Sequence, residues 1–232
     1  MRCTRRPLWD RVRPLVSAEV RQKSGKGTMA VSFADIAPKF DRVFGFIQRD
    51  LERILTLSPG GNFAVAGLAA CACETLARYR YGTGEGADVF SRLLPAGPLK
   101  VVARCLYDIL RNGLVHRYDT ADIRVDGKIV QLVISWGAEP HLSIKDIEGV
   151  PNLVLNVRTL CEDLFTQFAE YARELEQSVE ARDRFFTRYR ETGVVEITVP
   201  AQVEAWKEIV GDLDSEKFCR AVPVGYAAIR KG

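Results

Sequence analysis

A run of eleven residues with no polar side chain, residues 63–73, constrains the fold more than any other stretch of the chain. The run is too short to span a membrane, which takes about 20 apolar residues. A helix that is apolar on every side must be covered by other elements. The run therefore predicts a central buried helix that continues to about Tyr81. Hydrophobic residues make up 47% of the 232 residues, which is enough for such a core.

Amphipathic patterns on both sides of this run supply the covering helices. Ser32 and Asp35 have the spacing of a capping box, and apolar residues then recur at steps of three and four from Ile36 to Leu55. The clearest such pattern in the chain runs from Leu153 to Leu175. Further helices are predicted at residues 87–94, 98–117, 180–191 and 202–210. The predicted buried face of the 98–117 helix consists of Val101, Val102, Cys105, Leu106, Ile109, Leu110 and Leu114.

A short β segment interrupts the helices. Ile123 and Val125 alternate with charged residues, Asp126-Gly127 is a preferred type I′ turn pair, and residues 128–136 are rich in β-branched side chains. A further short strand is predicted at residues 194–199. The expected fold class is mainly α: a bundle of four to five helices with an inserted β-hairpin near residues 122–136.

The charge distribution separates the first 28 residues from the rest. They carry eight basic and two acidic residues, whereas residues 29–232 carry 25 basic and 28 acidic ones. We expect residues 1–28 to be a flexible leader or to precede the true start at Met29; a transit peptide and a basic nucleic-acid arm are the alternatives. Residues 29–178 would form the bundle, and residues 179–232 would be a helical and strand extension packed on the same domain. The mildly acidic body does not by itself indicate a nucleic-acid binder.

The cysteines and histidines narrow the chemistry that is available. Six scattered cysteines in apolar surroundings, with no secretory segment before them, predict free thiols in a reducing cytoplasm. Only His116 and His141 are present, and no set of residues has metal-ligand spacing, a P-loop or a nucleophile elbow. We therefore expect no metal and no cofactor. The chemistry concentrates in residues 106–118.

Arg111 and Asn112 precede His116 by five and four residues, near the end of a predicted helix. Asn112 and His116 share one face of an α-helix, and Arg111 lies about 140° around it, within reach of its long side chain. A guanidinium can hold a phosphate while an imidazole moves a proton to or from a ribose hydroxyl. The group therefore suits the chemistry of RNA phosphodiesters.

The pattern Arg111-Asn112-x-x-x-His116 resembles the signature of the HEPN family (higher eukaryotes and prokaryotes nucleotide-binding). The likeness extends more loosely over residues 33–178: a central apolar helix with an acidic residue, Glu74, then the motif helix and another long helix. The resemblance implies a HEPN-like, typically dimeric helical bundle. Many members are metal-independent endoribonucleases of toxin–antitoxin or other defence systems, and others only bind.

The resemblance also assigns roles and partners. Arg111 would bind and polarise the scissile phosphate, His116 would be the general acid/base, and Asn112 would orient the site, with Glu74 and Tyr118 as supporting residues. The expected partners are RNA, a second copy of the chain and, for a toxin, a cognate antitoxin; no membrane is expected. The alternative function is a non-catalytic RNA-, nucleotide- or protein-binding module.

A purely structural interpretation of the same residues stays open. His116 could cap the helix, Arg111 could pair with Asp108, and Asn112 could be a surface amide. Gly113 argues against this interpretation, because alanine there would stabilise a helix by about 1 kcal/mol. A glycine in this place suggests a close approach, which we expect to come from the motif helix of the partner in a dimer.

Overall fold

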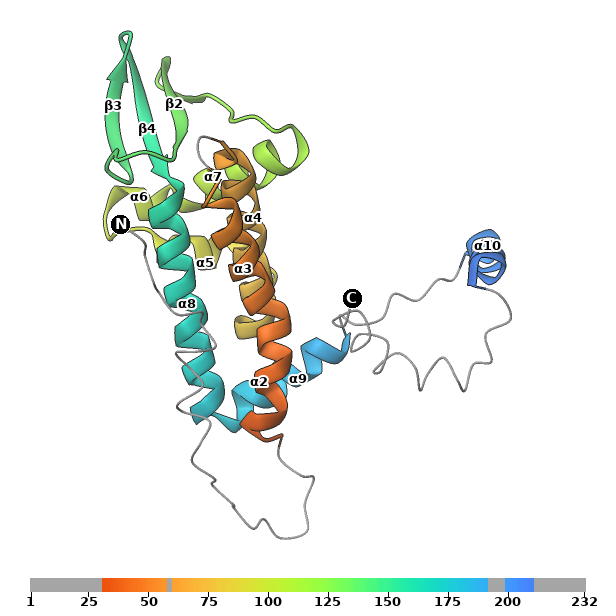
Figure 1. The fold of residues 1–232 in the computed structure, drawn as a ribbon. Coiled ribbons are helices and arrows are strands. Elements are labelled where there is room, and N and C mark those ends of the chain that lie inside the picture. The colour runs from red at the N-terminus through yellow and green to blue at the C-terminus, as the bar shows by residue number, and fades with distance from the viewer. Residues whose placement is uncertain (1–30, 58–59, 192–198, 211–232) are drawn as a thin grey trace. The chain divides into compact units, whose positions relative to one another are not determined.

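The computed structural model describes residues 31–57, 60–191 and 199–210. Its contacts divide the chain into two units, Met1–Glu191 and Thr192–Gly232. The described part of the first unit is the body drawn in Figure 1. In the second unit, α10 (Pro200–Val210) lies where the last helix is predicted. The predicted leader, residues 1–28, and most of the predicted strand at 194–199 lie outside the described residues.

The body begins with a long helical element of three parts, α2 (Phe33–Phe40), η2 (Asp41–Gly45) and α3 (Phe46–Ile54), of which η2 is wound as a π-helix. Ser32 is its N-cap, since its side chain accepts a hydrogen bond from the Asp35 N–H across 3.2 Å. This confirms the start predicted for the first helix.

The apolar run forms α4 (Asn62–Leu76), which continues as a second π-helical turn, η3 (Ala77–Tyr81). Eight of the 15 residues of α4 are buried, most of them alanine or another small residue. Small side chains let neighbouring helices come close, and α4 contacts α3, α5 (Gly86–Leu93), η4 (Ile109–Leu114) and α8 (Val157–Gln177). The prediction of a central buried helix is confirmed.

The segment predicted as one helix over residues 98–117 is broken. It comprises α6 (Pro98–Val101), α7 (Ala103–Asp108) and the π-helical η4. The break at Val102 puts α6 out of phase with α7. As a result Val101, Val102 and Cys105 are exposed, and their predicted burial is wrong, whereas Leu106, Leu110 and Leu114 are buried as predicted.

A four-stranded sheet follows, with the order β1-β2-β4-β3. Its strands are β1 (Ile123–Val125), β2 (Lys128–Ser135), β3 (Ser143–Ile147) and β4 (Val150–Asn156). β1 and β2 form the predicted antiparallel hairpin around Asp126 and Gly127, both with positive φ. β4 pairs in parallel with β2 and antiparallel with β3, so the sheet is mixed. Figure 1 shows it at one end of the helical body.

The second hairpin, β3–β4, is a correction to the sequence prediction. Leu153, predicted to begin a long helix, lies in β4, and α8 starts only at Val157. From Asn152 to Asn156 every residue of β4 is buried, so the strand lacks the alternation that identifies a half-buried strand. Asn156 is the N-cap of α8, where its side chain accepts from the N–H groups of Arg158 and Thr159.

Aromatic side chains fill the end of the body away from the sheet. Phe44, Phe168 and Tyr171 pack together with Phe185 of α9 (Val179–Glu191), with ring centroids 5.0 to 6.4 Å apart. The Tyr171 hydroxyl donates to the carbonyl of Tyr79 across 2.7 Å, and burial raises its pKa above the ordinary value. Among the described residues, no helix is long and apolar enough to cross a membrane.

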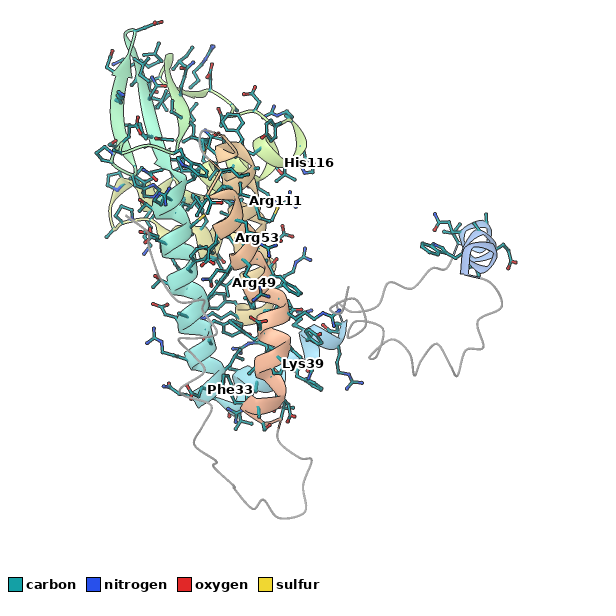
Figure 2. All side chains as sticks on the ribbon, in the orientation of Figure 1. Phe33, Lys39, Arg49, Arg53, Arg111 and His116 are labelled. Atoms are coloured by element: carbon teal, nitrogen blue, oxygen red, sulfur yellow. The ribbon has the colours of Figure 1, made fainter. Side chains whose placement is uncertain are left out.

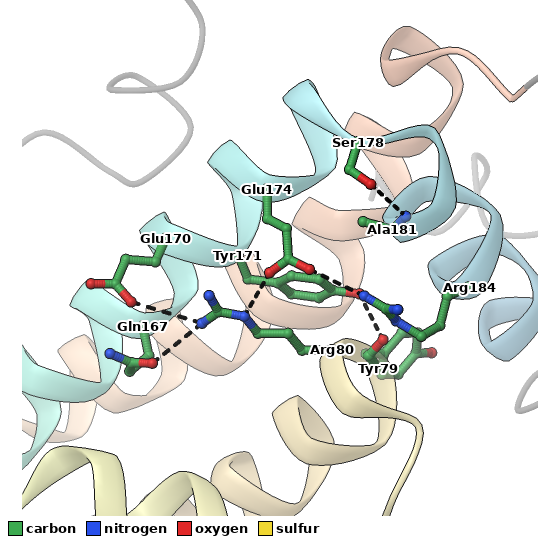
Figure 3. A network of polar contacts seen from close by, with 9 residues as sticks. All are labelled: Tyr79, Arg80, Gln167, Glu170, Tyr171, Glu174, Ser178, Ala181 and Arg184. Carbon is green, nitrogen blue, oxygen red and sulfur yellow. Dashed lines mark hydrogen bonds and ion pairs between the residues drawn. The ribbon is translucent and has the colours of Figure 1, made fainter.

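A network of charged and polar side chains connects η3 with α8 and α9 beside these rings (Figure 3). Arg80 donates to Glu174 across 2.8 Å and to Gln167 across 3.3 Å, and Arg184 donates to the other oxygen of Glu174 across 3.1 Å. The side chain of Arg80 is only 15% exposed, so its charge is offset by these acceptors rather than by solvent. The fold is thus mainly helical, with a small mixed sheet.

Candidate functional site

Most of the motif lies on a π-helix rather than on an α-helix. Arg111, Asn112 and Gly113 belong to η4, which ends at Leu114, and His116 is the second residue after it. A π-helix bonds residue i to residue i+5, so it turns residues five apart towards one side more than an α-helix does. The angle of about 140° expected between Arg111 and His116 is therefore too large. Figure 2 marks Arg111 and His116 on the body, in the orientation of Figure 1.

Arg111 is bound to Glu74 of the central helix. Its Nε donates to Oε2 of Glu74 across 3.2 Å, and the two side chains are 27% and 23% exposed. The other oxygen of Glu74 accepts from Arg78, one helical turn further along. Arg111 makes no ion pair with Asp108, so that part of the structural interpretation is wrong. Of the two predicted supporting residues, Glu74 is the one the structure brings to Arg111.

The Arg111–Glu74 ion pair is partly shielded from solvent. Burial lowers the pKa of Arg111, but the hydrogen bond to Glu74 and nearby negative groups outweigh it, so the pKa lies above its ordinary value. Tyr107, one turn before Arg111, is buried, and burial together with the charge of Glu74 raises its pKa to about 12. Tyr107 is therefore a neutral hydroxyl at pH 7. Nη1 of Arg111 is buried and has no hydrogen-bond partner among the described residues.

Asn112 and His116 are exposed. Within the described ranges, neither side chain makes a hydrogen bond or ion pair, so His116 does not cap its own helix through its ring. One chain thus supplies a fixed guanidinium at Arg111 and, further along the same element, a solvent-facing imidazole at His116. Among the described residues, no hydrogen bond or ion pair joins the two side chains.

Gly113 is buried, and its close neighbours are residues that follow it in the same chain. Its carbonyl accepts from the N–H groups of Arg117 and Asp119 across 2.9 and 3.3 Å, which closes the helix end. A Cβ added at Gly113 would lie 2.5 Å from the carbonyl oxygen of Asp119. Because the backbone at Asp119 comes back against Gly113, the need for a glycine here is explained without a second copy of the chain. A dimer contact at Gly113 stays a prediction.

Tyr118 lies apart from the Arg111–Glu74 pair. It has a φ of 56°, is 63% exposed, and its ring meets that of Phe63 edge-on at 5.6 Å between centroids. Phe63 and Glu74 are eleven residues apart on one helix, which is about 16 Å along its axis. Tyr118, which packs on Phe63 at the start of α4, therefore lies at the opposite end of this helix from Glu74.

Tyr107 and Arg78 are neighbours of the ion pair that the sequence analysis did not select. Tyr107 precedes Arg111 by four residues and Arg78 follows Glu74 by four, so both lie on the same helix faces as the pair. That spacing would have identified them once Glu74 was placed opposite Arg111. In the part of the chain that the structure describes, no three His, Cys, Asp or Glu side chains come together closely enough to hold a metal ion.

Comparison with known proteins adds no relative, since no family model, curated protein or solved structure matches the chain.

Proposed function

We propose that the chain is a HEPN-like, metal-independent endoribonuclease of a defence or toxin–antitoxin type, which cleaves RNA through the ribose 2′-hydroxyl. The observation that carries the proposal is the Arg111–Glu74 ion pair, 3.2 Å long, at the π-helical motif. It fixes the direction of a guanidinium whose side chain is still 27% exposed. A guanidinium held in this way is prepared to take a phosphate oxygen.

The proposed reaction is an internal transfer at phosphorus. The 2′-oxygen bonds to phosphorus and gives up its proton, while the bond from phosphorus to the 5′-oxygen breaks and that oxygen takes up a proton. His116 would carry a proton in this exchange, and Arg111 would offset the charge that builds on the phosphate oxygens. The products are a 2′,3′-cyclic phosphate and a 5′-hydroxyl. Asn112 would orient the phosphate or the imidazole.

The separation of the functional groups within one chain supports a composite site in a homodimer. Arg111 is held towards Glu74, whereas His116 and Asn112 face solvent. Two copies with their motif helices side by side would place the His116 of one chain near the Arg111 of the other. Such pairing would also cover Val115, an apolar side chain that is 42% exposed beside the motif.

A non-catalytic binding module is the second candidate. It is favoured by the acidic balance of residues 29–232 and by the absence, among the described residues, of a hydrogen bond between His116 and Arg111. In that case Arg111 and its neighbours would hold an RNA phosphate, a nucleotide or an acidic protein segment without turnover. The cytoplasmic location and a cognate antitoxin remain predictions under either function.

The chemistry of the cut ends tests the enzymatic proposal. The purified chain is incubated in EDTA with a mixed pool of RNA oligonucleotides and with a 2′-deoxy pool of the same sequences, and the products are analysed by mass spectrometry. We expect 2′,3′-cyclic phosphate ends from the RNA and no cleavage of the DNA. Cleavage of both pools, or 3′-hydroxyl ends, would overturn the mechanism. Binding of RNA without any product would favour the binding module.

A further inference from the structure

A cavity of about 490 Å³ lies on the body, away from the motif residues. Its wall comes from three places: the end of α5 with Leu94 and Pro95, the segment His141–Leu142 that precedes β3, and the second and third turns of α8. The volume is in the range of small-molecule sites, and Leu93, Leu94 and Leu142 give the wall an apolar part.

His141 lines this cavity, and the backbone N–H of Asn156 fixes its ring. Its Nδ1 accepts the N–H of Asn156 across 3.1 Å, so the neutral ring carries its hydrogen on Nε2. Burial lowers the pKa of His141, which keeps the ring neutral at pH 7. Nε2 is buried and has no partner among the described residues. The amide of Asn156 also donates to the carbonyls of Gly137 and Glu139, 3.0 Å each, which holds this segment against the start of α8.

Two opposite charges line the same cavity without pairing. Arg92 lies over the ring of Tyr81, with 4.8 Å from its guanidinium carbon to the centroid, and makes no ion pair or side-chain hydrogen bond among the described residues. Asp163 likewise has no such partner in the described ranges, and burial and then Glu162 raise its pKa. Gln167 accepts from Arg80 through its oxygen, so its amide N–H groups remain available as donors.

We propose that this cavity binds a small molecule that carries an anionic group, an N–H donor and an apolar part. The anionic group would lie against Arg92, and the donor against Asp163. The apolar part would cover Leu93 and Leu142. A free amino acid with an apolar side chain and a nucleoside monophosphate both have this chemistry, and they differ in the anion. The site is independent of the proposed nuclease function.

Calorimetric titration of the full chain tests the proposal with two probes, L-leucine and AMP, and with acetate, inorganic phosphate and adenosine as partial probes. We expect one of the two complete probes to bind with a Kd below about 1 mM and the partial probes to bind more weakly. Binding of L-leucine would identify a carboxylate site and binding of AMP a phosphate site. A Kd above 1 mM for both would overturn the proposal.

Variants test whether the probes bind in this cavity or elsewhere on the surface. Arg92→Ala and Asp163→Asn should each weaken the complete probe about tenfold or more, since each removes a charged hydrogen bond. Arg173→Ala, on an exposed position of α8, is the matched control and should bind as wild type does. Circular dichroism establishes that each variant is folded. Equal binding by wild type and folded Arg92→Ala would contradict the assignment, whatever the result of the RNA assay.

Discussion

Nε of Arg111 lies 3.2 Å from Oε2 of Glu74, which ties the motif π-helix to the central helix of the body. Glu74 is near the end of α4, and the buried Tyr107 lies one turn before Arg111. The direction of the Arg111 side chain is therefore set by the packing of η4 on α4. This makes Glu74 a positioning residue for the proposed phosphate contact.

Changing Glu74 should affect cleavage through Arg111. Glu74→Gln keeps an oxygen that can accept from Nε, whereas Glu74→Ala leaves the guanidinium free to turn. We expect Glu74→Ala to lower the cleavage rate about tenfold or more and Glu74→Gln to lower it less. The free energy of unfolding should fall by only about 1 kcal/mol in Glu74→Ala, because the pair is partly exposed.

Urea denaturation and RNA cleavage measured on the same preparations separate the two effects of Glu74. A purely structural role would lower stability and leave the rate of the folded fraction unchanged. If the Ala and Gln variants cleave equally fast, Glu74 does not position Arg111.

Gly113 should be needed by the monomer itself. A Cβ at this position would lie 2.5 Å from the Asp119 carbonyl oxygen, so Gly113→Ala must displace the chain that follows His116. We expect the free energy of unfolding to fall by about 1–3 kcal/mol, as is usual when a packed site is overfilled. Chemical denaturation gives the value. If Gly113→Ala loses no stability, the segment around Asp119 moves aside at little cost.

The proposed dimer is better tested at Val115 than at Gly113. Val115 is 42% exposed next to the motif, so Val115→Asp should place a charge in the contact without emptying the core. Val101→Asp, at an apolar position that is 85% exposed on α6, is the matched control. Light scattering at high micromolar concentration should show a dimer for wild type and for Val101→Asp, and a monomer for Val115→Asp. A monomeric wild type would contradict the composite site.

His141 should make stability depend on pH between about 5 and 7. Burial lowers its pKa in the folded chain, whereas the unfolded chain has the ordinary value of about 6.5. In that range the unfolded chain binds more protons, so the contribution of His141 is complete above about pH 6.5 and is lost as the pH falls towards the lowered folded pKa.

Unfolding of wild type and of His141→Gln, measured at each pH, isolates this contribution. The stability difference between the two should shrink as the pH drops from 7 to 5. A difference that stays constant or grows would contradict a neutral, buried His141.

The sequence predicts elements whose signal is local, and it fails where tertiary packing decides. The all-apolar α4, the Ser32 cap and the Asp126-Gly127 turn follow from neighbouring residues, and the structure has all three. The sequence predicts Leu153 in a helix, because a strand buried on both faces, such as β4, shows no alternation. The π-helical winding at Arg111 has no sequence pattern of its own. Glu74 and Arg111, 37 residues apart, are brought together only by the packing of η4 on α4.

The rate of RNA cleavage by His116→Ala, compared with wild type under single-turnover conditions in EDTA, tests the central claim most directly. Arg104→Ala, an exposed change on the same segment, is the control and should match wild type. We predict that His116→Ala lowers the rate about 100-fold or more, because a positioned acid/base contributes at least that much. Arg111→Lys should also fail, since an ammonium cannot replace the planar guanidinium. A folded His116→Ala that cleaves as fast as wild type would contradict the account.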